Sequence, residues 1–185
     1  MSSEPTTAPS DDSVDRDLVD WLAELSRVDP GIEAARMRLL RIGRQSEQML
    51  AGIAAQHGLT LGDWETLSVL RRSGPPYAVT PSELMAALGV TSGTVSVRIE
   101  RLQKAGLVEP AGGREDGRSR PVRLTGEGTR RWQAATDART AFEHRLFTQA
   151  FTPAQILRLN NLLRALMIEL EAELGPPPRR PDDQR

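Results

Sequence analysis

One stretch, residues 80–106, constrains the fold of this chain more than any other. Thr80 and Pro81 suit the N-cap and the first position of a helix, and Glu83 stands where a capping box places an acid. Gly89 then supplies the residue type that most readily adopts the left-handed conformation at a helix end. The pattern therefore predicts a short helix that ends in a glycine turn.

A second helix follows this turn, with Thr91 or Ser92 as its N-cap. Apolar residues recur on one side of it at helical spacing: Val95, Ile99 and Leu102. Between them lie polar and basic residues that we expect to face away: Thr94, Ser96, Arg98 and Arg101. Two ordinary surface helices could share this pattern. A polar, basic second helix after a glycine turn nevertheless favours a helix-turn-helix, whose free face enters a DNA major groove.

The residues after the two helices predict a β-hairpin. Residues 107–111 and 121–124 have the pattern of strands, and residues 112–120 form a turn rich in charge. Pro110 and Pro121 have no backbone N–H to donate, so we expect both at strand ends or at a sheet edge. Such a hairpin is a β-wing, and it favours the helix-turn-helix over a pair of ordinary surface helices.

The charge of the chain is small overall but unevenly distributed. The net charge is −1. Residues 1–30 carry eight acids and two arginines, a net of −6, whereas residues 91–131 carry nine arginines or lysines and five acids, a net of +4. The basic charge therefore lies where the DNA-binding face is expected.

Composition argues against several other classes of protein. The chain has no cysteine, which excludes disulfides and cysteine-bound zinc, and His57 and His144 are far apart, so we expect no metal and no cofactor. No apolar run approaches the roughly 20 residues of a membrane span, and the N-terminus is polar and acidic. We expect a cytoplasmic protein without a membrane partner. No catalytic triad, phosphate-binding loop or carboxylate pair is evident, so we expect no enzyme.

Long helices are predicted on both sides of the central region. Residues 15–28 form a short amphipathic helix, and residues 32–57 a long one with an apolar seam of Ile32, Ala35, Leu39, Ile42, Ser46, Met49 and Ile53. Thr125 caps a helix to about residue 149, with Trp132, Ala135, Phe142 and Leu146 inward. The last helix repeats apolar residues at coiled-coil-like spacing: Ile156, Leu159, Leu163, Leu166, Leu170 and Leu174. Seams that a small lone domain cannot bury predict a two-fold homodimer.

The expected fold is mainly α with a small β-wing. Its domain plan has a disordered tail at residues 1–12 and N-terminal dimerisation helices at 13–58. A winged helix-turn-helix follows at 59–125, then C-terminal dimerisation helices at 126–174 and a disordered tail at 175–185.

This chain resembles the MarR family of winged helix-turn-helix regulators over about residues 32–174. The matching motifs are LGVTSGTVSVRIERLQKAGLVE, an Asp-x-Arg wing at Asp116 and Arg118, and Val-x-Leu-Thr-x-x-Gly at residues 122–128. The resemblance implies a homodimer that binds palindromic double-stranded operators, often with a small ligand between its lobes. It implies groove contacts from Ser92, Thr94, Val95, Ser96 and Arg98, with wing Arg118 oriented by Asp116. The basic residues Arg101 and Arg120 complete the expected DNA face.

The chain looks more specifically like the urate-responsive branch of that family, which adds an N-terminal helix with a tryptophan. Residues 63–67, DWETL, match the branch's Gly-Trp-Asp-x-Leu stretch, so Glu65 stands for its acid and Arg98 for its recognition-helix arginine. Trp21 stands for the tryptophan at a different spacing, although it could equally be core or interface filler. A ligand-contacting arginine of that branch falls on Pro110. We therefore expect a small organic ligand, anionic or aromatic, other than urate.

Two functions remain in competition. The first is a transcriptional repressor that a small ligand releases from DNA. The second is a winged-helix module that docks another protein and binds no operator. For Arg98 there are likewise two roles, because it can pair with guanine or form an ion pair with Glu65. The basic wing and the small polar residues at the start of the second helix favour the regulator.

Overall fold

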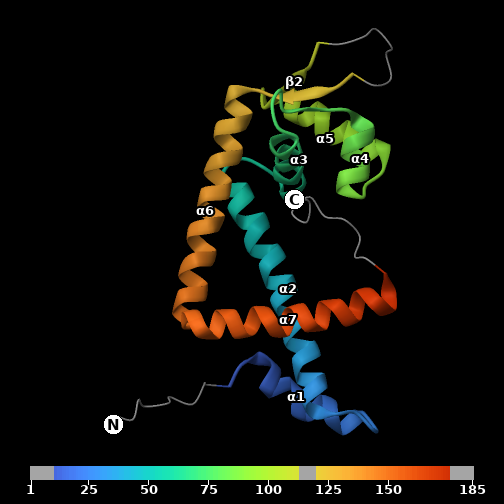
Figure 1. Ribbon diagram of the computed structural model, residues 1–185, viewed down its shortest axis with the longest axis vertical. Coiled ribbons are helices and arrows are strands. Elements are labelled where there is room, and N and C mark those ends of the chain that lie inside the picture. Colours follow the sequence, from blue (N-terminus) through green and yellow to red (C-terminus); the bar gives the residue numbers. More distant parts are fainter. Residues whose placement is uncertain (1–10, 113–119, 176–185) are drawn as a thin grey trace. The chain divides into compact units, whose positions relative to one another are not determined.

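The computed structural model describes residues 11–112 and 120–175. It is mainly helical with one small antiparallel sheet, as the sequence predicts (Figure 1). The chain divides into two compact units, residues 1–49 and 50–185. The cut falls within one long helix, α2 (Pro30–Gln56). The expected tails at residues 1–12 and 175–185 fall almost wholly outside the described residues.

The first unit contains α1 (Ser13–Glu24) and most of α2. Helix α1 starts two residues before the predicted position because Asp12 caps it. The Asp12 carboxylate accepts from the amides of Val14 and Asp15, and the Asp15 carboxylate accepts from the Asp12 amide. The helix also ends earlier than predicted, at Glu24, and Arg27 beyond it has a φ of 69°. The prediction of residues 15–28 was therefore wrong at both ends.

Ionic contacts hold α1 against α2 within this unit. Arg38 pairs with Asp12 at 2.8 Å and also with Asp15, and Arg41 pairs with Asp17 at 2.5 Å. The Arg38 guanidinium, together with backbone amides, lowers the pKa of Asp12 to about 2. The acidic N-terminal segment therefore has a structural role, which is to neutralise arginines on the next helix.

The second unit is built around the helices α3 (Leu61–Arg72), α4 (Pro81–Leu88) and α5 (Ser92–Lys104). Their apolar faces meet strands β1 (Ala78–Val79), β2 (Val108–Pro110) and β3 (Val122–Leu124) in one core. Its most deeply buried large side chains are Leu67, Leu70, Leu84, Val95, Leu102 and Leu107. Most of this core lies within the residues that the sequence assigns to the winged helix-turn-helix, and Ala54 of α2 and Ala135 complete it from outside that range.

The predicted helix caps are present in this unit. Thr80 and Glu83 form the predicted capping box at α4, and Thr60 and Asp63 form a further one at α3. Gly89 ends α4 with a φ of 63°, and Thr91 caps α5. Of the two caps considered for the second helix, Thr91 is correct, and Ser92 is the first helical residue. These local signals fix where the two helices of the helix-turn-helix begin and end.

The sheet is antiparallel with strand order β1-β3-β2, so β3 is central and β2 is an edge strand. Pro110 lies on that edge opposite Val122, and Pro121 immediately precedes β3, as their missing N–H groups require. Both wing strands are shorter than predicted. The next helix packs closely under the sheet at Gly128, where a Cβ would lie 2.0 Å from the Leu107 carbonyl oxygen. Only glycine fits there, which explains the last residue of the Val-x-Leu-Thr-x-x-Gly motif.

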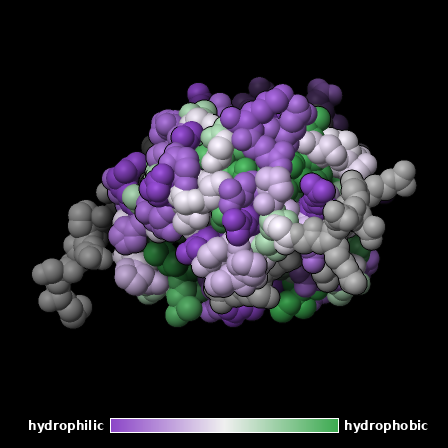
Figure 2. Space-filling model, turned by 90° about the horizontal axis from the view of Figure 1, so that it is seen from above, coloured by the Kyte–Doolittle hydropathy of each residue, from purple (hydrophilic) through white to green (hydrophobic). Residues whose placement is uncertain are grey.

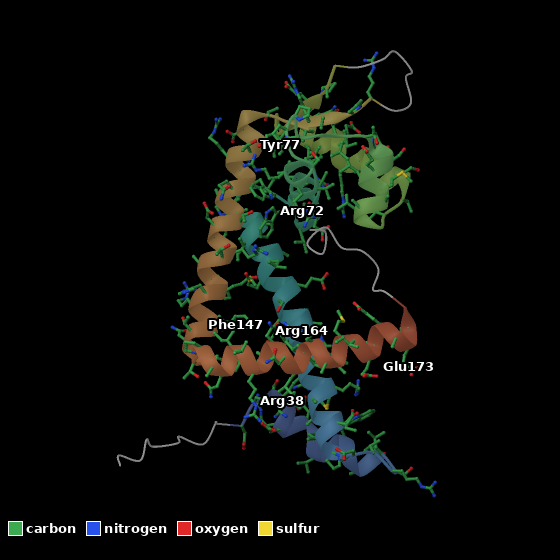
Figure 3. All side chains as sticks on the ribbon, in the orientation of Figure 1. Arg38, Arg72, Tyr77, Phe147, Arg164 and Glu173 are labelled. Atoms are coloured by element: carbon green, nitrogen blue, oxygen red, sulfur yellow. The ribbon has the colours of Figure 1, made fainter. Side chains whose placement is uncertain are left out.

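Two long helices, α6 (Gly126–Ala150) and α7 (Pro153–Leu174), complete the second unit. They meet at a corner after Phe147, which Figure 3 labels. Ala135 of α6 is fully buried, but Leu146, predicted to point inward, is 49% exposed. Helix α7 buries none of its residues in this chain, and its seam residues Leu163, Leu166 and Leu170 are all exposed. The apolar seam exists as predicted. Ile156 and Leu159 at its start are half-buried, and the rest of the seam is exposed among the described residues.

Among the helices of the described residues, none is long and apolar enough to cross a membrane.

Candidate nucleic-acid interface

Helix α5 presents small polar residues on its exposed side. Ser92, Thr94 and Ser96 are all exposed, and Ser96 Oγ donates to the Ser92 carbonyl oxygen at 2.9 Å. Val95 does not belong with them. It is 1% exposed and packs in the core, so its predicted groove contact was wrong. The exposed valine of this helix is Val97, at 59%, which the sequence-based list of groove residues omits.

Arg98 turns away from the free face and seats on the first turn of α3. Its Nη1 donates to the Gly62 carbonyl oxygen at 3.2 Å and lies 3.3 Å from Glu65 Oε2. A Cβ at position 62 would lie 2.5 Å from Arg98 Cζ, so the glycine provides the space for the guanidinium. The ion pair between Arg98 and Glu65, one of the two roles considered for Arg98, is thus present. The sequence-based expectation that Arg98 lies on the free face of the helix, away from the core, was wrong.

Arg101 lies one helical turn further along α5 and binds the same turn of α3. Its Nη2 lies 2.6 Å from Asp63 Oδ1 and 3.1 Å from Thr60 Oγ1, and its Nε lies 3.0 Å from both Asp63 oxygens. The Asp63 side chain is only 5% exposed, and that of Arg101 is 46% exposed. Arg101 was also expected to face away, and it instead joins α5 to the capping box of α3.

The two arginines together fix the recognition helix to the helix behind it. Guanidinium groups are the side chains best suited to bidentate contacts with guanine, and here both are engaged with groups of α3. Apolar packing from Val95 and Leu102 adds to this attachment. As a result α5 is a rigidly backed helix whose outer face carries small side chains.

The wing contributes basic residues next to this helix. Arg120 is exposed just before β3, and Arg123 on β3 pairs across the sheet with Glu109 of β2 at 2.8 Å. Arg118 and Asp116, the expected minor-groove arginine and its partner, lie outside the described residues. In Figure 2, which views the molecule from above, most of the coloured surface is hydrophilic.

Aromatic and basic side chains hold α3 against α6. Trp132 Nε1 donates to Ser68 Oγ at 2.9 Å, and Trp64 Nε1 donates to Thr136 Oγ1 at 3.2 Å. The Arg71 guanidinium lies 4.7 Å from the centroid of the Tyr77 ring, near the sheet (Figure 3). Helix α3 is therefore anchored on one side by α6 and on the other by α5.

The three residues predicted to line a ligand pocket do not all occur in one unit. Glu65 and Arg98 belong to the second unit and contact each other. Trp21 belongs to the first unit, where its indole Nε1 donates to Glu33 Oε1 at 2.7 Å. Glu33 is 8% exposed, and contacts from Arg36 and Trp21 lower its pKa. A buried carboxylate that partners Trp21 carries no recognisable signal in the sequence pattern and was not predicted.

The fold and this site define a winged helix-turn-helix protein. Residues 57–119 match the MarR family profile. PecS from Dickeya dadantii, an HTH-type transcriptional regulator, is 32% identical over 90 residues, which cover 49% of this chain and 54% of PecS. The chain thus matches about half the length of that regulator. IacR from Pseudomonas putida, an HTH-type transcriptional repressor, is 26% identical, with 72% of this chain and 77% of IacR covered.

Solved structures show the same fold. AbsC, a MarR family transcriptional regulator from Streptomyces coelicolor, has a TM-score of 0.63 at 22% identity, covering 80% of this chain and 99% of AbsC. A mutant of MarR from E. coli complexed with operator DNA has a TM-score of 0.58 at 21% identity, with 77% of this chain and 99% of that chain covered. Residues 57–119 therefore match the MarR family, and the chain has the winged-helix fold of the solved MarR structures.

Proposed function

We propose that this chain is a homodimeric, sequence-specific DNA-binding regulator that places α5 in the major groove of a palindromic operator. The observation that carries the proposal is the exposed polar face of α5, Ser92, Thr94 and Ser96, on a helix fixed from behind by Arg98 and Arg101. Rigid backing matters because base contacts give specificity only when the helix keeps one orientation. The structure of a MarR mutant from E. coli, a protein of the same fold, complexed with operator DNA supports the proposal that the chain binds an operator.

Dimerisation is assigned to the helices at residues 13–58 and 126–174. The exposed apolar seam of α7 supports this assignment, because Leu163, Leu166 and Leu170 need a partner to leave water. A two-fold dimer should contact two half-sites about 10 bp apart from centre to centre. A footprint of a monomer on one asymmetric half-site would contradict the assignment.

A mobility-shift assay with the DNA beside the chain's own gene tests the proposal directly. We expect a salt-sensitive shift, weakened by about 1–3 kcal/mol in Arg118→Ala at fixed salt, while the protein stays folded and dimeric. Arg120→Ala should have a smaller effect of the same kind. A folded dimer that shifts no DNA from that region or from a random pool would favour the protein-docking alternative.

We infer further that the regulator is a repressor and that a small organic acid releases it. The ion pair between Arg98 and Glu65 supports this switch, because an anion could compete for the Arg98 guanidinium and repel Glu65. A ligand that binds the altered state better would shift α5 away from its DNA-binding position. The name of IacR, a transcriptional repressor, is consistent with the sign of the response.

The switch can be tested with two variants that break one ion pair in different ways. Glu65→Gln removes the acid, and Gly62→Ala places a methyl group where the Arg98 guanidinium lies. The ligand itself is found by a thermal-shift screen of small organic and aromatic acids, followed by a test of DNA release. Both variants should then alter the ligand concentration that releases DNA. Normal release from both Glu65→Gln and Gly62→Ala would place the ligand elsewhere.

A further inference from the structure

The outer face of α5 contains one apolar side chain that the proposed function does not use. At 3.6 residues per turn, Gly93, Val97, Glu100 and Lys104 follow one another along the middle of this face. Val97 is 59% exposed, whereas Val95 two residues earlier is 1% exposed. A β-branched residue at an exposed helical position favours neither helix formation nor contact with water. On the face that is proposed to meet DNA, it is therefore the side chain available for an apolar contact.

The surroundings of Val97 leave room for such a contact. Helical side chains lean toward the N-terminus of their helix, so Val97 covers the turn that contains Gly93. A Cβ built on Gly93 would meet nothing within 4 Å, so the surface beside Val97 is open. On the other side Glu100 is neutralised by Lys104, whose Nζ lies 2.6 Å from Glu100 Oε1. The acid therefore adds little repulsion toward a phosphate backbone.

The chemistry of the major groove offers one apolar group to this side chain, the C5-methyl group of thymine. The residues around Val97 offer hydroxyl groups, and the two nearest arginines are engaged with α3. We propose that Val97 is a specificity-determining residue that packs against a thymine methyl group in each half-site. This inference rests on the proposed DNA binding. It adds that an apolar contact selects a thymine at one position of each half-site.

The test uses the full-length dimer and DNA duplexes selected from a random-sequence pool at one fixed salt concentration. Each thymine of the selected site is replaced in turn by deoxyuridine, which lacks only the methyl group. At one position per half-site we expect about a fourfold loss of affinity for one methyl group, and about fifteenfold when both half-sites are changed. Replacement elsewhere in the site should change affinity less than twofold.

The protein side of the test removes the same contact. Val97→Ala should bind the thymine and the deoxyuridine duplexes within twofold of each other. Val19→Ala makes the same substitution at an exposed valine of α1 and should keep the full discrimination. Since Val97 is exposed and alanine favours helices, the variant should fold as the wild type does, which circular dichroism and thermal unfolding verify.

Three results separate the inference from the function on which it rests. A selection that returns no sequence overturns both. A selected operator that tolerates deoxyuridine at every thymine leaves the regulator intact and overturns the role of Val97. If Val97→Ala still discriminates between the thymine and the deoxyuridine duplexes, another residue makes the methyl contact, and the proposed role of Val97 is also overturned.

Discussion

The winged helix-turn-helix and helix α7 use the same kind of residue in opposite ways. Leu84 of α4 is 0% exposed, buried by elements of its own chain, whereas Leu170 of α7 is 45% exposed. The first region thus gains its hydrophobic stabilisation within one chain, whereas among the described residues Leu170 remains exposed, and we propose that a second copy of the chain covers it. We therefore expect the stability of helix α7 to depend on protein concentration and that of the winged helix-turn-helix to be independent of it, although both regions are helical.

The largest effect should come from charging the region that depends on a partner. The double variant Leu166→Glu/Leu170→Glu places acids on the α7 seam, where an apolar interface would have to bury them unpaired. We expect the dissociation constant of the proposed dimer to rise by at least a thousandfold, so that the variant is a monomer at micromolar concentration. Sedimentation velocity would measure it.

A matched pair on the helix surface serves as the control. Arg158→Glu and Arg164→Glu reverse charge on the same helix without loading its leucine seam. A dimer that survives Leu166→Glu/Leu170→Glu would break the comparison, because the α7 seam would then not be the face that a partner covers.

Truncation in the self-contained region should have the next largest effect. Leu84→Ala removes a fully buried side chain and should lower the free energy of unfolding by about 2–5 kcal/mol. The loss arises within one chain, so denaturant titrations that follow the winged-helix transition should give the same difference at two protein concentrations. A concentration-dependent loss would show that this core also relies on the partner.

How well each region could be predicted follows from how local its determinants are. The caps at Thr80 and Thr91 and the glycine turn at Gly89 depend on a few adjacent residues, and all were predicted. The bounds of α1 were not predicted. Its start depends on an equally local capping box of Asp12 and Asp15, which the apolar pattern does not reveal, and its ion pairs with α2 join residues distant in sequence.

The errors at the candidate site have a similar cause. Helical periodicity alone separates buried Val95 from exposed Val97, so that correction was available from the sequence. The seating of Arg98 on Gly62 and of Arg101 on Asp63 was not, because long flexible side chains can turn toward either solvent or a neighbouring helix. Whether an arginine is free for DNA depends on tertiary packing.

A third prediction concerns the attachment of α5 to α3. Arg101→Gln should lower the free energy of unfolding by about 1–2 kcal/mol, since Asp63 loses its partner but the guanidinium is half exposed. DNA affinity should fall while the slope of log K against log salt stays unchanged. A slope reduced by about one unit would instead indicate a phosphate contact by Arg101.

The smallest effect concerns α1, where ion pairs with α2 add to the burial of Val14 and give a third kind of packing to compare. The pKa of Asp12 is lowered to about 2, chiefly by Arg38, from a usual value near 3.8. A carboxylate with a depressed pKa stabilises the folded state above its usual pKa, and this contribution is lost as the pH falls through about 2.

At pH 3, NMR of the side-chain carboxyl carbon should find Asp12 still ionised. In Arg38→Ala the pKa should move toward its usual range, so that much of Asp12 is protonated at the same pH. Arg36→Ala is the matched control, because Arg36 pairs with Glu33 and should leave Asp12 unchanged. An Asp12 that titrates alike in all three proteins would mean that Arg38 does not hold α1 in solution.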